Sequence, residues 1–216
     1  MVAEGSGLAG KTLAAPEGEA SRLMFPAFAR ANAVDAPKVL WQAVTPQLRE
    51  TMLAQKRVDG ITGFVSTSWF NLRAAGVDTS TLLVMRYNDF GVDILGNAIL
   101  ATEATIQKNP KMVEAFVRAT IAGMKDLLAD GPGGMAQLKK RDALLNEALE
   151  LERWALVRDL VVLTPHVKAN GFSEITPARL EATVRTVAEA YNVVDKVKPA
   201  DVYTAQFLPP QAARRP

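Results

Sequence analysis

Short apolar runs alternate with segments of helical spacing in the first half of the chain. A run of four to eight mainly apolar residues between turn signals is typical of a buried strand, whereas apolar residues at every third or fourth position are typical of a helix. Strands are expected at 11–15, 39–44, 61–65 and 82–86. Helices are expected at 17–33, 45–58 and 66–75. Strands separated by helices favour βαβ units and a largely parallel sheet.

Three positions predict where these helices start or stop. Thr45 supplies a capping hydroxyl and Pro46 fits the first helical position, so a helix is expected to begin there. Pro26 predicts a start or a kink inside the first helix. Gly76 follows the last apolar turn of the third helix and is expected to end it.

The second half of the chain has a mainly helical pattern. An amphipathic helix is expected at 111–129, and the glycine- and proline-rich residues 131–134 are expected to break it. Its apolar stripe comprises Met112, Phe116, Ala119, Ile121 and Met124. Further helices are expected at 135–141, at 144–163 and from Pro177 onward. Residues 197–216 hold four prolines and are expected to form an irregular tail, in which Arg214 and Arg215 are solvated.

Extended segments at 92–95 and 98–101 flank Gly96 and Asn97 and have few strands with which to pair. A strand needs partners for its backbone groups. This imbalance predicts that an upstream part of the fold is missing from the chain.

Composition fits an ordinary globular protein. The chain has 216 residues, of which 49% are apolar and 22% charged, enough for one large domain or two small lobes. Charges are mixed along the sequence with a net charge of +2, so no nucleic-acid partner is indicated. The absence of cysteine excludes disulfides and thiolate metal sites. Apolar runs stay shorter than the ~20 residues that span a bilayer and the first residues lack a signal-peptide pattern, so we expect neither membrane insertion nor an export signal.

Two features suggest chemistry but fit other roles better. Residues 5–12 match the phosphate-loop pattern G-x-x-x-x-G-K-[ST], yet a working loop follows a buried strand and opens a helix. Here Pro16 soon ends an extended run, so Gly10 and Lys11 are expected to turn into a strand. His166, the single histidine, has no nucleophile or metal-ligand partners beside it and is expected on the surface or in a turn. We therefore expect no catalytic residue, no metal and no cofactor.

Candidate binding residues gather in loops after the predicted strands, where ligands of open parallel sheets bind. In the loop at 16–22, Gly18 allows close approach of the backbone to a ligand, and amides at the following helix start can hold a polar group. Glu17 and Glu19 either meet a cationic or amide-bearing ligand or cap that helix. Aromatic side chains in the later loops suit a flat ligand, and each also suits core packing. The candidate set is Glu17, Gly18, Glu19, Ala20, Ser21, Thr45, Thr62, Gly63, Phe64, Trp69, Tyr87 and Asn88.

Several short motifs follow one another in a recognisable order. They are GKTLA at 10–14, the Gly18 loop, QKRVDGIT at 55–62, GNAILA at 96–101, and Asn109-Pro110 ahead of a long helix. This order resembles the substrate-binding proteins of bacterial ABC importers. The resemblance is to the branch that includes nitrate-, alkanesulfonate-, taurine- and thiamine-pyrimidine-precursor-binding proteins, and it covers most of residues 7–192.

The resemblance implies a type II periplasmic-binding-protein fold, an α/β architecture with one complete βα lobe and the helix-rich C-terminal part of the other lobe. The implied parts are an N-terminal stub at 1–9, a second-lobe ligand-binding subdomain at 10–95, a mainly helical return to the first lobe at 96–196, and an irregular tail at 197–216. Family members usually carry a signal peptide and most of the first lobe ahead of residues 8–12. The chain is therefore expected to be truncated, lacking the N-terminal part of that lobe.

The function implied by the resemblance is that of a non-catalytic, periplasmic or otherwise extracytoplasmic receptor. It would bind a small polar or aromatic solute in a cleft between lobes and deliver it to the membrane permease of an ABC importer. Glu17 and Glu19 argue against a simple anion such as nitrate. Three alternatives stay open: an enzyme like the relatives that make the thiamine pyrimidine, the effector-binding domain of a transcription regulator, and a truncated fragment without a function of its own.

Overall fold

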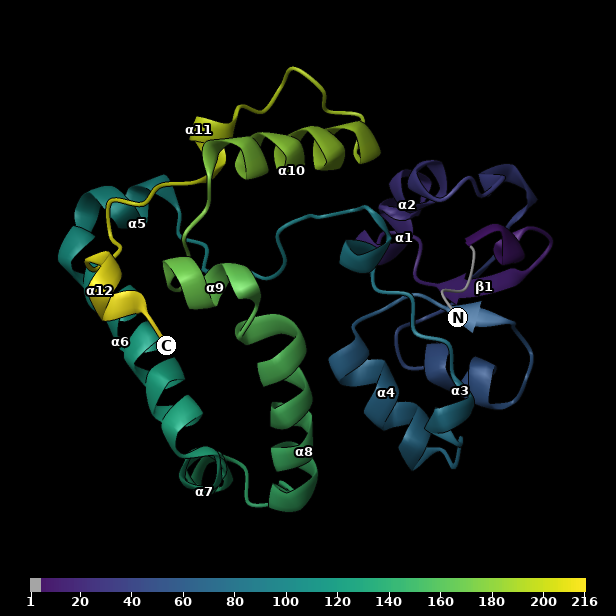
Figure 1. The fold of residues 1–216 in the computed structure, drawn as a ribbon, viewed down its shortest axis with the longest axis horizontal. Coiled ribbons are helices and arrows are strands. Elements are labelled where there is room, and N and C mark those ends of the chain that lie inside the picture. Colours follow the sequence, from purple (N-terminus) through teal and green to yellow (C-terminus); the bar gives the residue numbers. More distant parts are fainter. Residues whose placement is uncertain (1–4) are drawn as a thin grey trace. The chain divides into compact units, whose positions relative to one another are not determined.

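The computed structural model describes residues 5–216, so the first four residues of the predicted stub lie outside the described part. The chain forms two compact units (Figure 1). Unit 1 contains the residues up to Leu95 together with Pro177–Val202, and unit 2 contains Gly96–Thr176 together with Tyr203–Pro216. The lobe boundaries implied by the resemblance stay predictions.

Unit 1 is built on a parallel sheet, which has three strands among the described residues in the order β2-β1-β3. The strands are β1 Thr12–Ala15, β2 Leu40–Ala43 and β3 Gly60–Ile61. Leu13 of β1 lies opposite Trp41 of β2 and Gly60 of β3. A Cβ atom at residue 60 would lie 2.8 Å from the Leu13 Cδ2 atom, so glycine lets β3 come this close without displacing the Leu13 side chain. The parallel sheet and the helices around it confirm the predicted α/β class.

The α-helices of unit 1 are α1 Ala20–Leu23, α2 Phe25–Ala31, α3 Arg49–Ala54, α4 Val65–Ala74, α10 Pro177–Ala190 and α11 Pro199–Val202. Short 3₁₀ helices lie at Gly5–Leu8, Ala36–Lys38, Thr79–Thr81 and Tyr87–Phe90. Phe25 and Phe28 share one buried face of α2, and their core cluster includes Leu13 of β1. The Phe28 ring stacks on Tyr87 with 5.1 Å between the ring centroids. Packing on α2 therefore anchors the Tyr87 loop to the same core as β1.

Unit 2 is helical over its described residues. Its helices are α5 Glu103–Lys108, α6 Pro110–Ala129, α7 Gly131–Arg141, α8 Glu147–Val157, α9 Pro165–Asn170 and α12 Gln211–Arg214, and a π-helical turn at Arg158–Val162 continues α8. Four of the helices begin with a polar side chain that accepts a hydrogen bond from the first turn. These caps are Thr102, Asp130, Asn146 and Thr164. Such caps satisfy backbone N–H groups that have no partner inside the helix.

The predicted strand at 61–65 is much shorter in the structure. It covers only Gly60–Ile61, and α4 already begins at Val65. Phe64, which made the run look like a strand, is 57% exposed and has extended backbone angles as the residue before the helix. Its apolar character therefore reflects neither the sheet nor the core.

The predicted strand at 82–86 is wrong, and the extended segments at 92–95 and 98–101 form no strand either. Leu83 is 66% exposed, so its apolar side chain does not belong to the core. Val92 is buried in the core of unit 1 through its side chain alone. An apolar pattern can require burial, but a strand also requires the backbone of a neighbouring strand.

Helix boundaries were predicted with mixed success. Pro26 lies in the first turn of α2, after a break that separates α2 from α1, which confirms the predicted start or kink. Gly76 follows α4 with φ of 82°, as expected for a glycine that ends a helix. The Thr45-Pro46 start is wrong, because Pro46 lies in a turn and α3 begins only at Arg49.

The break after α6 was predicted at residues 131–134, and this is wrong by a few residues. The chain breaks at Asp130, and the glycines and Pro132 form the first turn of α7. The Asp130 carboxylate accepts a hydrogen bond from the Gly133 amide at 2.9 Å. A capping aspartate followed by proline in the first turn is a favoured helix start, and it outweighs the low helix propensity of glycine.

The predicted irregular tail at 197–216 contains α11 and α12, and Arg214 is not solvated. Only 7% of Arg214 is exposed. Its guanidinium donates to the carbonyl oxygens of Phe172 at 2.7 Å and Pro209 at 2.9 Å, and to a Glu174 carboxylate oxygen at 2.8 Å. These acceptors draw the last turn of the chain into unit 2.

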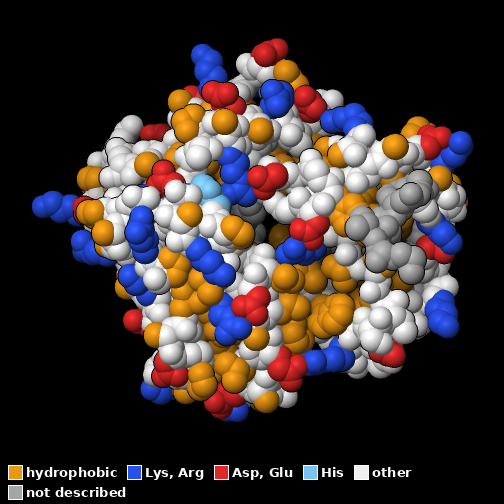
Figure 2. Space-filling view, viewed as in Figure 1, with side chains coloured by type: hydrophobic (Ala, Val, Ile, Leu, Met, Phe, Trp, Pro, Cys, Tyr) orange, Lys and Arg blue, Asp and Glu red, His pale blue; other side chains and the backbone are white. Residues whose placement is uncertain are grey.

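Surface charge is mixed, as the sequence indicated. Figure 2 shows basic and acidic side chains interspersed over the visible face. In the described part of the chain, no helix combines the length and the apolar character needed to cross a bilayer.

Candidate functional site

The carboxyl ends of the three parallel strands lead into loops and helices that meet at one buried polar cluster. We call it the Arg49 cluster; it comprises Glu19, Ser21, Arg49, Glu50, Thr62 and Ser68. Glu19 and Ser21 follow β1, Arg49 and Glu50 follow β2, and Thr62 and Ser68 follow β3. Parallel strands end at the same edge of a sheet, which explains why residues so far apart in sequence come together.

Arg49 lies at the centre of the cluster. One guanidinium nitrogen, Nη1, donates to Glu19 at 2.5 Å, while Nη2 and Nε donate to one Glu50 oxygen at 3.0 and 3.2 Å. Burial lowers the pKa of Arg49, but the hydrogen bonds that Arg49 donates to Glu19 and Glu50 and the charges of these carboxylates outweigh burial and raise that pKa above its ordinary value. The guanidinium also packs over Gly63, where a Cβ atom would lie 2.8 Å from the Arg49 Cζ atom.

Hydroxyl groups complete the cluster on both sides. Ser68 donates to the same Glu50 oxygen at 2.6 Å. On the other side, the Ser21 hydroxyl lies 3.0 Å from Glu19 Oε2 and 3.0 Å from the Thr62 hydroxyl. A hydroxyl has one proton to donate, so when Ser21 donates to Glu19 it accepts from Thr62. The cluster is thus a continuous network of charge-assisted hydrogen bonds.

The charges in the cluster do not balance. One guanidinium faces two carboxylates, Glu19 and Glu50, which leaves one excess negative charge. The side chain of Glu50 is 8% exposed, whereas that of Glu19 is 22% exposed. The part of the excess charge that a dissolved molecule can reach therefore lies at Glu19, at the rim of the network.

Tyr87 closes the cluster from another loop. Its hydroxyl donates to the Ser21 carbonyl oxygen at 2.6 Å, while its ring stacks on Phe28. Burial raises the pKa of the Tyr87 hydroxyl, and the negative charge of Glu19 raises it further. Tyr87 thus acts as a neutral donor that holds the loop of Ser21 in place.

The predicted site residues divide into those that meet at the cluster and those that do not. Contacts of the cluster include Glu19, Ser21, Thr62, Gly63 and Tyr87. The remaining candidates have surroundings of other kinds, and a binding role for them stays a prediction. Glu17, Gly18 and Ala20 are exposed around the start of α1, Thr45, Phe64 and Asn88 are exposed in later loops, and Trp69 is half-buried on α4.

Arg49, Glu50 and Ser68 are not among the candidate residues predicted from the sequence. In the structure the apolar Leu48 is exposed, whereas the charged Arg49 and Glu50 beside it are buried. Their positions in the sequence could have pointed to them, because all three follow predicted strands whose adjoining loops were already candidate binding loops.

The phosphate-loop match at residues 5–12 and the single histidine, His166, lie outside the Arg49 cluster. Lys11 forms an ion pair with Asp59 at 3.3 Å, and the strand that follows it confirms the predicted turn rather than a phosphate loop. His166 lies half-buried on α9, with Nε2 2.7 Å from the Glu174 carbonyl oxygen. Among the described residues, no three histidine, aspartate or glutamate side chains are grouped so as to hold a metal ion.

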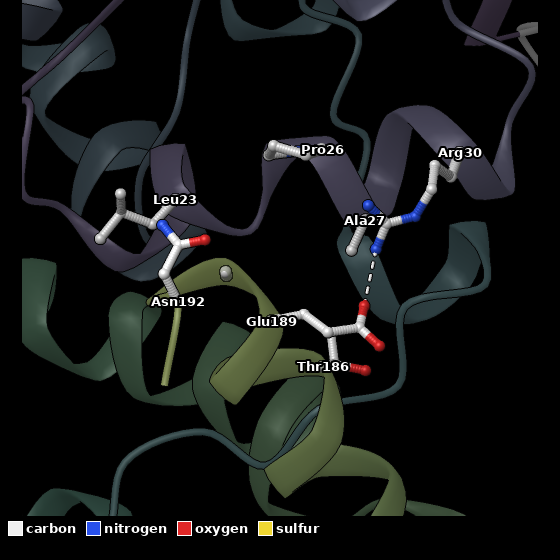
Figure 3. A pocket seen from close by; sticks show the side chains of 8 residues that line it. Leu23, Pro26, Ala27, Arg30, Thr186, Glu189 and Asn192 are labelled. Atoms are coloured by element: carbon white, nitrogen blue, oxygen red, sulfur yellow. Dashed lines mark hydrogen bonds and ion pairs between the residues drawn. The ribbon is translucent and has the colours of Figure 1, made fainter. Parts of the chain in front are cut away.

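Unit 1 also has an open groove of about 260 Å³ between α2 and α10. Leu23 and Pro26 form part of one wall, and Asn192 belongs to the other. Figure 3 shows Arg30 and Glu189 reaching toward one another across this groove, where they form an ion pair at 3.1 Å. The groove shares no residue with the Arg49 cluster.

A parallel sheet with polar loops gathered at its carboxyl edge is consistent with a type II periplasmic-binding-protein fold. A family model described as NMT1/THI5 like matches residues 3–132, which is more than half of the chain. The chain therefore belongs to the NMT1/THI5-like family. That family includes ABC substrate-binding proteins and biosynthetic members. No curated protein matches the chain.

Proposed function

We propose that this chain is the solute-binding component of an ABC importer and that the Arg49 cluster forms part of its solute site. The observation that carries the proposal is a buried ionic network at the carboxyl edge of the sheet with one carboxylate, Glu19, at its rim. Family membership supports a receptor role. The proposed partner is the membrane permease of the importer, and the proposed location is outside the cytoplasm.

The arrangement of the cluster favours recognition over proton transfer. Arg49 and Ser68 hold Glu50, and Arg49 and Ser21 hold Glu19, so each carboxylate has fixed donors around it. A network in which acceptors are fixed in advance binds a polar solute without reorganising. We therefore propose a binding protein without a catalytic step.

We further propose that the solute carries amine, amidine or amide N–H donors on a small, flat framework. The excess negative charge and the rim position of Glu19 favour such donors and oppose nitrate or a sulfonate. The protons of the Ser21 and Thr62 hydroxyls are engaged inside the network, so these oxygens have only lone pairs left, which suit N–H donors of a solute. Phe64 is exposed and Trp69 half-buried, so both offer ring surface near these loops to a flat molecule.

A thermal melt of the full chain with single added compounds tests this proposal. Benzamidine, 4-aminopyrimidine and nicotinamide represent the proposed class, and nitrate, taurine and ethanesulfonate represent anions. A solute present at 100 times its Kd stabilises the folded state by about 2.7 kcal/mol. For a protein of this size that raises the midpoint by roughly 5–10 °C. A shift with the first group alone supports the proposal, and a shift with the anions alone contradicts it.

A second readout separates a receptor from an enzyme. Any compound that shifts the melt is incubated with the protein and recovered for mass spectrometry. A receptor returns the compound unchanged in mass and amount. Conversion of the compound would contradict the non-catalytic role and favour the biosynthetic branch of the family.

A further inference from the structure

A chain of side-chain contacts links the loop of Tyr87 and Asn88 to α10. The Asn88 amide donates to Asp93 Oδ1 at 2.9 Å. Arg179, near the start of α10, donates to the same oxygen at 2.8 Å and to Asp93 Oδ2 at 3.2 Å. Both carboxylate oxygens of Asp93 are thus engaged, and the planar guanidinium fixes the direction in which the carboxylate faces.

The contacts lie where the chain leaves and re-enters unit 1. Asp93 is two residues before Leu95, the last residue of the first segment of unit 1, and Arg179 is two residues after Pro177, where the second segment begins. A further bond joins the same two segments, because the Leu95 amide donates to the Thr183 hydroxyl at 3.4 Å. Position and contacts together make this the place where α10 is fastened to the segment that follows the Tyr87 loop.

The same loop reaches the Arg49 cluster from its other end. Tyr87 donates to the Ser21 carbonyl, and Ser21 contacts Glu19 and Thr62. Within the loop, the amides of Gly91 and Val92 both donate to the Tyr87 carbonyl, so Tyr87 and Asn88 move with the residues that precede Asp93. A displacement of Asp93 is therefore passed to the cluster through a short, hydrogen-bonded segment.

We propose that Arg179 and Asp93 are a positioning pair, which sets the conformation of the loop at 87–91 and through it the placement of Ser21. The value of this pair for solute binding rests on the proposed function, but its effect on the loop does not. The side chains of Arg179 and Asp93 are 28% and 60% exposed, and ion pairs this exposed contribute little to global stability. The pair therefore acts locally, on the loop.

Hydrogen exchange of the full chain without any solute tests the proposal. Arg179→Gln and Asp93→Asn both remove the ion pair, and the asparagine still offers Asn88 an acceptor. Arg30→Gln is the matched control, because it removes a different ion pair of α10, that with Glu189. We expect exchange at 87–92 to accelerate at least threefold in both test variants and to stay at the wild-type rate in the control.

Swapping the two charges tests whether a restored ion pair also restores the loop. In the double variant Asp93→Arg with Arg179→Asp, the pair can form again and Asn88 can accept through its amide oxygen, so exchange at 87–92 should return toward the wild-type rate. The proposal is overturned if Arg179→Gln changes exchange only within α10, or if Arg30→Gln accelerates the loop equally. No solute is present in this experiment, so it tests the positioning pair even if no compound of the panel binds. Failure of the positioning pair in turn leaves the proposed solute-binding function untouched.

Discussion

The guanidinium of Arg49 packs directly against Gly63, so close that a methyl group on residue 63 would overlap it. The nearest approach would be 2.8 Å to Cζ, with 2.9 and 3.0 Å to the two terminal nitrogens. Contacts this short would force the guanidinium to shift, and Glu19 and Glu50 hold it in place on its other sides. Glycine at this position is therefore a requirement of the cluster rather than of the turn alone.

Replacing Gly63 by alanine should destabilise the protein by about 1–3 kcal/mol, as overpacking in a filled site does. The free energy of unfolding in urea measures this directly. Gly18→Ala is the matched control, since a Cβ there would meet no atom within 4 Å. Equal stability of the two variants would show that Arg49 moves aside freely.

Replacing Arg49 alone should lower the free energy of unfolding more than replacing Arg49 and Glu50 together. Arg49→Met leaves Glu50 buried without its cation, and breaking a buried pair in this way costs about 3–5 kcal/mol. The double variant Arg49→Met with Glu50→Gln removes that stranded charge as well and should recover part of the loss. If urea unfolding instead shows additive losses, the two side chains are not energetically coupled.

Tyr87 should make stability depend on alkaline pH. The ordinary pKa of 10.0 applies to the unfolded chain, and burial raises the pKa in the folded chain. The neutral hydroxyl therefore contributes stability that is full below pH 10 and is lost as pH rises toward the folded pKa. Tyr87→Phe has no hydroxyl at this position and therefore lacks this pH dependence. It also lacks the hydrogen bond to the Ser21 carbonyl oxygen, and that bond is worth about 1 kcal/mol. The stability gap between wild type and Tyr87→Phe should narrow above pH 10; a constant gap would contradict this.

Arg214 and Arg215 offer a paired test in unit 2. Arg214→Ala removes donors from three buried or half-buried acceptors and should cost about 3 kcal/mol. Arg215→Ala, at an exposed neighbour, should change stability by no more than about 0.5 kcal/mol. Urea unfolding with tryptophan fluorescence compares the two, and similar values would remove Arg214 from its anchoring role.

The sequence allowed the α/β class and the parallel strands at residues 12–15 and 40–43 to be predicted, because apolar runs and turn residues there agree with the tertiary fold. It also led to the loops after the strands, since strand order alone places Glu19 and Thr62 at one edge. Periodicity failed at Leu83, where an apolar run lacks a pairing strand. It failed again at Arg49 and Arg214, because whether a charged side chain is buried depends on distant partners that no local pattern records.

Calorimetric titration tests the central claim, that Glu19 at the rim of the Arg49 cluster contacts the solute. The titrant is whichever of benzamidine, 4-aminopyrimidine or nicotinamide shifts the melt most, and the proteins are wild type, Glu19→Gln and Glu181→Gln. Loss of a charge-assisted hydrogen bond should raise the Kd of Glu19→Gln by roughly 10- to 100-fold. The exposed α10 residue Glu181 serves as the control, with an unchanged Kd. Equal affinities in all three proteins would contradict a solute site at the Arg49 cluster.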